Sequence, residues 1–225
     1  MRVRKPVDIT QLQNWHPWLL LPAVGRTGRL ILTFEPETFY EAEMIEVRFH
    51  GRGGQGAVVA SKVLAVAFFH EGFYVQSFPA FGVERRGAPV MAFLRVDRQP
   101  IQLRVNIYEP DHIVVLDPTL IGAIDVTSGL KQNGWIIINS HQPPEVFGHL
   151  KGFRTATVDA TSTAIRNGLG SRTNPIVNTA ILGAFSKVTG LVGIDSIALA
   201  IREEVPGKKN ENAKAAREAY QEVKF

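Results

Sequence analysis

A glycine-rich segment holds the residues of this sequence that are best suited to bind an anion. Gly51-Arg52-Gly53-Gly54-Gln55-Gly56 follows a strand predicted at 45–50 and precedes a helix predicted to start at Ala57. Glycines let the backbone approach a bound group closely, and a helix start offers unpaired N–H groups and the positive end of its dipole. The segment fits the GxGxxG pattern, so it predicts a loop able to hold a phosphate group.

The same segment lacks the features of the two common nucleotide-binding loops. A dinucleotide-binding domain places Asp or Glu at the end of its second strand to hold a ribose, but here that strand ends near Gln76-Ser77. A P-loop requires Lys and then Ser or Thr after its last glycine, and Ala57-Val58 stand there. NAD and ATP are therefore not expected ligands. A tight strand-to-helix turn that binds nothing remains the alternative.

The composition excludes several kinds of redox and catalytic site. The sequence has 225 residues and no cysteine, so it can supply no thiolate to an iron–sulfur cluster, no disulfide and no cysteine nucleophile. None of its six histidines has the HxH or HxxxH spacing of a metal-binding pair. No residue is assigned as a general acid, general base or metal ligand. We therefore expect no catalytic centre and no cofactor bound by this chain alone.

Charge and hydropathy favour neither a nucleic acid nor a membrane as a partner. The formal net charge at pH 7 is +4, but the basic residues are scattered among acidic ones. No apolar run reaches the roughly 18 residues that a membrane span needs. Pro6 and Asp8 stand where a signal peptide would have its apolar stretch. The sequence predicts a cytoplasmic protein.

Alternating strands and helices in residues 44–225 predict the fold of this main domain. Strands are predicted at 45–50, 74–77, 90–95, 101–105, 112–116, 135–139 and 155–159, and helices at 57–71, 123–132, 178–189, 195–204 and within 207–225. Asp195 is the expected N-cap of its helix, and the strands that meet at the turn 97–100 are expected to pair antiparallel. We expect a three-layer, Rossmann-like α/β domain with a largely parallel or mixed sheet, covered on both faces.

Residues 1–43 form an irregular N-terminal extension in this interpretation. They contain four prolines and several aromatic residues, among them Trp15 and Trp18, and only 30–34 has the pattern of a strand. Such a segment cannot build a core of its own. We therefore expect its aromatic side chains to pack on the main domain or on a partner chain.

Six segments, in order along the main domain, carry a family resemblance. They read EVRFHGRGGQG at 46–56, QSFPAFGVERRGAPV at 76–90, PDH at 110–112, LDPT at 116–119, INS at 138–140 and NPIVNTAILGAF at 174–185. In order and spacing they closely resemble the gamma subunits of the pyruvate:ferredoxin oxidoreductases, within the 2-oxoacid:ferredoxin oxidoreductase family. The GVERRGAP stretch is more similar to the pyruvate branch than to the 2-oxoglutarate branch.

The resemblance implies that this chain works as one subunit of an oxidoreductase complex. Such complexes interconvert a 2-oxoacid and coenzyme A with an acyl-CoA, CO2 and reduced ferredoxin. The resemblance places thiamine diphosphate with its Mg ion and the [4Fe–4S] clusters in partner chains, the alpha, beta and delta subunits. The gamma chain would carry none of these cofactors and would not be catalytic alone, which agrees with the absence of cysteine.

The resemblance also suggests a contact with coenzyme A, the co-substrate. Gly53, Gly54, Gln55 and Gly56 would supply backbone donors to a phosphate, and Arg85 and Arg86 would hold it through charge-assisted hydrogen bonds. Asn174 and Asn178 are further candidates, which come just before a predicted helix.

Each candidate also has a purely structural interpretation. The arginines could pair with Glu84 or an acidic partner surface, and the asparagines could cap the helix. Asp117, at the end of a buried strand, is more simply explained as a turn-forming residue than as a ligand contact. Phe78, Pro79 and Phe81 are expected to be packing or interface residues. For the whole chain, a stand-alone Rossmann-like nucleotide-binding protein or enzyme remains the alternative.

Overall fold

The computed structural model describes residues 23–24, 30–31, 44–80, 87–150 and 152–225. The chain divides into two units, Met1–Glu41 and Ala42–Phe225. In the first unit, β1 (Ala23–Val24) pairs antiparallel with β2 (Leu30–Ile31). The strand expected at 30–34 is therefore seen in its first two residues, while Trp15 and Trp18 lie outside the described residues.

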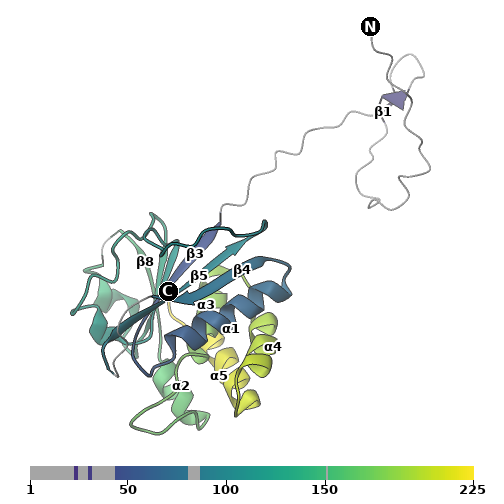
Figure 1. The fold of residues 1–225 in the computed structure, drawn as a ribbon. Coiled ribbons are helices and arrows are strands. Elements are labelled where there is room, and N and C mark those ends of the chain that lie inside the picture. Colours follow the sequence, from purple (N-terminus) through teal and green to yellow (C-terminus); the bar gives the residue numbers. More distant parts are fainter. Residues whose placement is uncertain (1–22, 25–29, 32–43, 81–86, 151) are drawn as a thin grey trace. The chain divides into compact units, whose positions relative to one another are not determined.

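Six strands of the second unit form one mixed sheet in the order β4-β5-β3-β6-β7-β8 (Figure 1). The strands are β3 (Ile45–Arg52), β4 (Tyr74–Pro79), β5 (Pro89–Asp97), β6 (His112–Val115), β7 (Trp135–Asn139) and β8 (Arg154–Val158). β3, β6, β7 and β8 run parallel, whereas β5 is antiparallel to both of its neighbours. The expected α/β class with a mixed sheet is confirmed.

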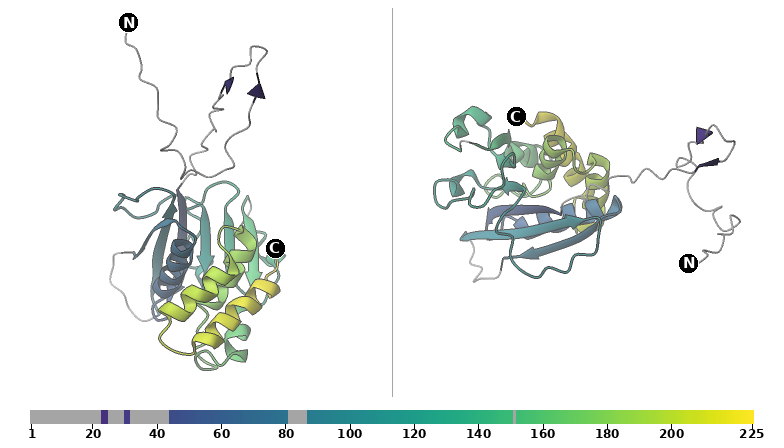
Figure 2. Two further views of the ribbon diagram at one scale, coloured as in Figure 1. Left: turned by 90° about the vertical axis from the view of Figure 1, so that its right-hand side faces the viewer. Right: turned by 90° about the horizontal axis from the view of Figure 1, so that it is seen from above.

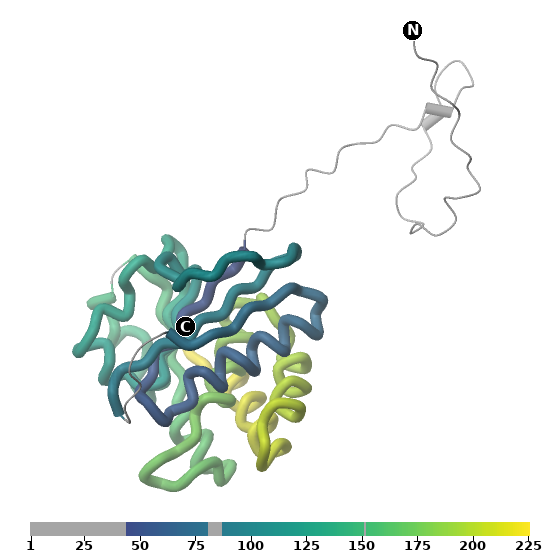
Figure 3. Tube along the Cα trace, in the orientation of Figure 1, coloured from purple at the N-terminus to yellow at the C-terminus, as the bar shows by residue number. Residues whose placement is uncertain are grey.

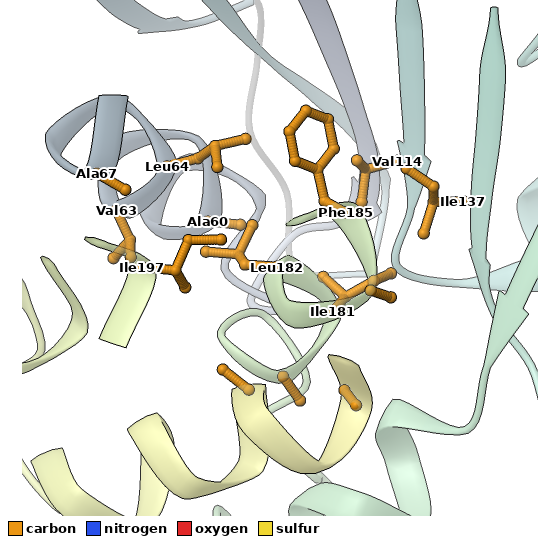
Figure 4. Packing of buried hydrophobic residues seen from close by; sticks show 14 of the residues in the cluster. Ala60, Val63, Leu64, Ala67, Val114, Ile137, Ile181, Leu182, Phe185 and Ile197 are labelled. Atoms are coloured by element: carbon orange, nitrogen blue, oxygen red, sulfur yellow. The ribbon is translucent and has the colours of Figure 1, made fainter. Parts of the chain in front are cut away.

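Helices cover one face of this sheet (Figure 2, left). They are α1 (Ala57–His70), α2 (Ala160–Arg166), α3 (Ala180–Thr189), α4 (Ile194–Glu204) and α5 (Lys209–Glu222). In the core, Phe185 of α3 points toward Val114 and Ile137 of the sheet, and Ile197 of α4 meets Val63 of α1 (Figure 4). Burial of such side chains is the main force that holds helices against a sheet.

The opposite face of β6 and β7 is covered by irregular chain. Ile113, Val115, Ile136 and Ile138 of the two strands pack there against a second apolar cluster. That cluster comes from turns and from the 3₁₀ segments η2 (Pro118–Leu120) and η3 (Pro144–Phe147), and its buried members are Leu120, Val126, Leu130 and Phe147. Both faces are thus covered as expected, but the third layer is made of turns rather than helices.

The prediction of a helix at 123–132 is wrong. These residues form successive turns, because the Asp125 side chain accepts hydrogen bonds from the Thr127 backbone N–H and hydroxyl, which competes with helix formation. Gly129 has φ +73°, a left-handed conformation that a helix interior does not allow. A Cβ at Gly129 would also lie 2.0 Å from the Tyr108 carbonyl oxygen.

The strand expected at 101–105 is also wrong. β5 already has β3 on one side and β4 on the other, so neither edge is open to a hairpin partner. Residues 101–105 carry no strand assignment, and the Leu103 carbonyl accepts a hydrogen bond from Gln76 Nε2 of β4. The alternating apolar pattern of this segment is typical of a strand, but β5, the strand next to it in the sequence, has no free edge with which to pair.

Two helices start at other residues than predicted, and a third helix was not predicted. α4 begins at Ile194 with Gly193 as N-cap, so Asp195 is not the N-cap but lies in the first turn. There its negative charge interacts favourably with the helix dipole, and its carboxylate pairs with Arg217. α3 begins at Ala180 rather than at Asn178. α2 was not predicted, although its capping residue is a typical one: Asp159 accepts from the Ser162 N–H at 2.8 Å.

The terminal helix expected within 207–225 is confirmed as α5, and it packs more closely than its polar sequence indicates. Its buried residues include Ala213, Ala215, Ala216 and Ala219. Figure 3 traces this C-terminal part in yellow, on the same side of the sheet as α1. Small side chains let α5 lie close against α3.

On the face of the sheet opposite the helices, called the outer face below, β3 carries buried polar side chains. Arg48 and His50 of β3 are buried, and Arg48 donates to His50 Nε2 at 3.0 Å and to the Val126 and Ser128 carbonyls. The bond from Arg48 makes Nε2 an acceptor, so Nδ1 carries the His50 proton. Nδ1 is buried and has no hydrogen-bond partner among the described residues. The histidine is therefore held neutral.

Acid is expected to destabilise the protein through His50. Burial and the charge of Arg48 lower the pKa of His50 from 6.5 to about 3. When the pH falls below the ordinary pKa of histidine, His50 binds a proton in the unfolded chain but stays neutral in the folded chain. The free energy of unfolding should therefore fall as the pH drops from about 6.5 toward 3, by up to about 1.4 kcal/mol per pH unit.

The variant His50→Gln should flatten this pH dependence, because an amide oxygen can still accept the Arg48 hydrogen bond but does not titrate. His112 keeps part of the slope, since burial lowers its pKa to about 4. Urea denaturation at a series of pH values measures the effect, with the exposed His141→Gln as control. If the free energy of unfolding of His50→Gln fell with pH as steeply as that of the wild type, His50 would not be the source of the acid sensitivity.

Candidate anion-binding site

The glycine loop lies where the connections of the sheet change sides. After β3 the chain passes through residues 53–56 into α1 on one face, whereas after β6 it enters η2 on the other face. β3 and β6 are parallel neighbours, so a crevice opens between their carboxyl ends. Open α/β sheets bind ligands at such a switch point.

Several N–H groups of the glycine loop have no hydrogen-bond partner among the described residues. Gly54 and Gly56 have φ +96° and +79°, which glycine adopts without strain. Gly53 N–H donates to the Ala88 carbonyl and Gln55 N–H to the Arg52 carbonyl. The N–H groups of Gly54 and Gly56 make no hydrogen bond with any described residue. Gly56 is also the N-cap of α1 and offers no side chain to cap it, so the first-turn N–H groups stay available.

Asn178 closes the crevice opposite the helix start. Its side chain is 6% exposed and its Oδ1 is buried without a partner among the described residues. A Cβ at Gly56 would lie 2.3 Å from Asn178 Nδ2, so any larger residue there would displace this amide. Buried amides are normally hydrogen-bonded, and an unsatisfied one indicates a missing partner such as a ligand or a water.

The glycine loop and the segment 173–178 enclose one cavity of about 670 Å³. Its lining includes Arg52, Gly53, Gly54, Gln55, Gly56, Gly87, Asn174 and Asn178. A second cavity of about 610 Å³ adjoins it over the ends of β7 and β8 and shares Asn139 and Thr161. Volumes of this size are typical of small-molecule sites.

Asp117 ties the glycine loop to the end of β6. Its carboxylate accepts from Arg52 Nε and Gln55 Nε2, both at 3.0 Å, and from the Thr119 backbone N–H and hydroxyl. Burial alone would raise the pKa of Asp117, but the hydrogen bonds from Thr119 and Gln55 and the charge of Arg52 hold it below its ordinary value. The turn-forming role expected for Asp117 is present, and the contact with the loop comes in addition.

The structure brings six of the eight candidate residues to one cavity. They are Gly53, Gly54, Gln55, Gly56, Asn174 and Asn178, whereas Arg85 and Arg86 lie outside the described residues. Gln55 lines the cavity, but its side chain is engaged within the loop, since its Oε1 accepts from the Arg52 N–H at 2.7 Å. Neither asparagine caps α3, because Thr179 is the N-cap.

Sequence reasoning missed Arg52, which lines the cavity and whose guanidinium bonds to Asp117, Thr119 and Gly87. It occupies a variable position of the glycine motif, so the motif itself gave no signal for it. Phe78 packs against Phe93 with ring centroids 5.2 Å apart, as a packing residue would, and Phe81 lies outside the described residues. Among the residues that the structure describes, no group of His, Asp or Glu is arranged to hold a metal ion. No helix there is long and apolar enough to cross a bilayer.

Fold and site together define a layered α/β domain with a glycine loop and a cavity at its switch point. Residues 46–222 match the family described as pyruvate ferredoxin/flavodoxin oxidoreductase. The chain therefore belongs to this family. The family resemblance found in the sequence is confirmed.

Two sequence relatives and one solved structure resemble the chain along most of its length. It is 55% identical over 186 residues to the pyruvate/ketoisovalerate oxidoreductases common subunit gamma of Pyrococcus abyssi, covering 81% of this chain and 98% of the relative. It is 53% identical over 183 residues to the pyruvate synthase subunit PorC of Methanothermobacter thermautotrophicus, covering 80% and 96%. The crystal structure of pyruvate oxidoreductase subunit PORC from Thermotoga maritima matches with a TM-score of 0.68 and 36% identity over 80% and 97% of the two chains.

Proposed function

We propose that this chain is the gamma subunit of a multisubunit 2-oxoacid:ferredoxin oxidoreductase that uses pyruvate and supplies part of its coenzyme A site. The support for the subunit role is the likeness to gamma and PorC subunits over nearly their whole length. The relative from Pyrococcus abyssi is named as common to pyruvate and ketoisovalerate oxidoreductases. A shared gamma chain would leave the choice of 2-oxoacid to other subunits.

The proposal assigns the redox chemistry to partner chains. Thiamine diphosphate with Mg and the [4Fe–4S] clusters would lie in the alpha, beta and delta subunits, and ferredoxin would exchange the electrons. This chain has no cysteine with which to hold a cluster. Neither nucleic acid nor membrane is a proposed partner, and the cytoplasm is the proposed location.

The observation that supports the coenzyme A contact is the start of α1, which has no side-chain cap, beside Asn178, whose Oδ1 has no hydrogen-bond partner among the described residues. Coenzyme A carries phosphate groups, which suit the unpaired N–H groups of Gly54 and Gly56 and the helix dipole. An asparagine amide can present either its NH2 or its oxygen to a ligand. It can therefore donate to a phosphate or accept from an amide N–H of the pantetheine arm.

Arg85 and Arg86 remain part of the proposal because of their position in the sequence. They directly precede Gly87, whose N–H donates to the Gly53 carbonyl at 3.1 Å. The Gly87 carbonyl in turn accepts from Arg52 Nη1 at 3.1 Å. A guanidinium that reached the loop would add charge-assisted hydrogen bonds to a phosphate.

Replacing Asn178 by Ala tests the proposal. The complex is purified through this chain, and 2-oxoacid- and CoA-dependent reduction of ferredoxin is measured. We expect Asn178→Ala to raise the KM for coenzyme A about tenfold, the loss of one buried hydrogen bond to the ligand. Stability should hardly change, because the buried Oδ1 of this amide has no hydrogen-bond partner among the described residues that the substitution could remove.

The exposed Asn210→Ala on α5 serves as the matched control. An unchanged KM for coenzyme A in Asn178→Ala would refute the proposed contact. If the chain purifies alone and its thermal unfolding shifts with NAD or ATP, the stand-alone nucleotide-binding alternative would be the better account. The missing ribose-binding carboxylate after β4 argues against that alternative.

A further inference from the structure

Asp117 uses its two carboxylate oxygens for two different tasks. Oδ1 accepts the Thr119 N–H at 3.0 Å and the Thr119 hydroxyl at 2.6 Å, which forms the turn after β6. Oδ2 accepts Arg52 Nε and Gln55 Nε2, each at 3.0 Å, which reaches the glycine loop. The turn and the loop are therefore served by separate atoms of one side chain.

The contacts of Oδ2 decide where two long polar side chains of the loop lie. Gln55 bridges Asp117 to the Arg52 backbone N–H, so its amide is engaged by the protein at the edge of the cavity between the glycine loop and residues 173–178, here called the anion cavity. The Arg52 guanidinium is shared among Asp117, the Thr119 hydroxyl and the Gly87 carbonyl. Without the carboxylate, both side chains would lose their common acceptor beside Gly54 and Gly56, whose N–H groups have no partner among the described residues.

We infer that Asp117 is a positioning residue for the anion cavity: its Oδ2 fixes Gln55 and Arg52, so that the glycine loop keeps its N–H groups open to the ligand. The inference rests on the proposed function of this cavity. It assigns Asp117 no direct contact with coenzyme A and no part in the chemistry.

The chain contains a matched control for this role. Asp125-Val126-Thr127 repeats the turn of Asp117-Pro118-Thr119, since Asp125 Oδ1 accepts the Thr127 N–H at 3.0 Å and the Thr127 hydroxyl at 2.7 Å. No hydrogen bond joins Asp125 to the glycine loop among the described residues. Asparagine keeps one oxygen for the Thr contacts but replaces the other with NH2, which cannot accept from Arg52 or Gln55. Asp→Asn thus spares the turn and removes only the loop contact.

The test compares Asp117→Asn, Asp125→Asn and Asn178→Ala in the assembled complex, with steady-state kinetics for coenzyme A and for the 2-oxoacid. We expect Asp117→Asn to raise the KM for coenzyme A about tenfold, because two hydrogen bonds to a charged acceptor are lost. The kcat and the KM for the 2-oxoacid should stay close to wild type. Asp125→Asn should leave all of these constants unchanged.

Each other outcome overturns the inference in a recognisable way. If Asn178→Ala raises the KM for coenzyme A and Asp117→Asn does not, the cavity binds coenzyme A without help from Asp117. If neither variant changes this KM, the proposed coenzyme A contact fails and the positioning role fails with it. If Asp117→Asn lowers kcat and raises both KM values alike, Asp117 serves only the general structure.

Discussion

Replacing Arg95 by Met is expected to lower the free energy of unfolding by about 3 kcal/mol or more, the loss found when one partner of a buried ion pair is removed. Arg95 is 1% exposed on the outer face of β5. Its Nε donates to Glu46 Oε1 at 2.7 Å and its Nη1 to Gln76 Oε1 at 3.1 Å. Methionine fills much of the same space but leaves the Glu46 carboxylate without its cation.

Part of the loss should be recovered in the double variant Glu46→Gln with Arg95→Met, because no charge is then left unpaired. Arg217→Met is the control, since Arg217 pairs with Asp195 on an exposed surface, where such pairs contribute about 1 kcal/mol or less. Urea denaturation, analysed with one common dependence of the free energy of unfolding on urea concentration, measures the stability of the three variants. Equal losses for Arg95→Met and Arg217→Met would show that burial of the pair does not matter.

Arg95 also explains how an irregular segment is held on the sheet. Its Nη2 donates to the Asn106 carbonyl at 3.4 Å, and Gln76 donates to the Leu103 carbonyl. Arg48 does the same for the turn at 126–128. Buried guanidinium groups on the outer face thus bind carbonyls of chain that has no ladder partner, which satisfies groups that would otherwise be costly to bury.

Sequence reasoning succeeded where the signal is local. The continuously apolar strands β6 and β7 and the helix α1 after the glycine loop follow from hydrophobic runs and from glycine chemistry. It failed at 101–105 because the edges of β5 are occupied by strands distant from that segment in the sequence. It failed at 123–132 because an Asp side chain and a left-handed glycine outweighed helix propensity.

The features of the candidate site also separate into those that the local sequence predicts and those that depend on tertiary packing. The place of the glycine loop between β3 and α1 was predictable from its own residues, but nothing local predicted that Asn178 would face Gly56. That contact depends on the approach of α3 to α1, a matter of tertiary packing. Asp117 shows the limit most clearly: its turn was predictable from Asp-Pro-Thr, whereas its bonds to Arg52 and Gln55 required the neighbouring strand.

Replacing Gly183 by Ala is expected to destabilise the protein by about 3 kcal/mol, the upper range for overpacking a core. Gly183 lies inside α3, where alanine would ordinarily gain up to about 1 kcal/mol by helix propensity. Here an added Cβ would lie 1.7 Å from the Ala216 carbonyl oxygen and 3.0 Å from the Tyr220 nitrogen of α5. These are backbone atoms of a packed helix, so α3 and α5 must move apart.

Gly207→Ala is the control, because a Cβ there meets no atom within 4 Å. Urea denaturation should therefore show a large loss of stability for Gly183→Ala and little change for Gly207→Ala. A Gly183→Ala variant as stable as wild type would mean that α5 does not lie this close to α3.

Gly183→Ala should also change the anion cavity. Thr179, next to Asn178, donates its hydroxyl to Asn212 Oδ1 of α5 at 2.6 Å, and both side chains are buried. Displacing α5 would pull on this bond and shift the amide that closes the cavity over Gly56. We therefore expect Gly183→Ala, assayed in the complex well below its melting temperature, to raise the KM for coenzyme A. The C-terminal helix would then act as the support of Asn178 as well as a cover for the core.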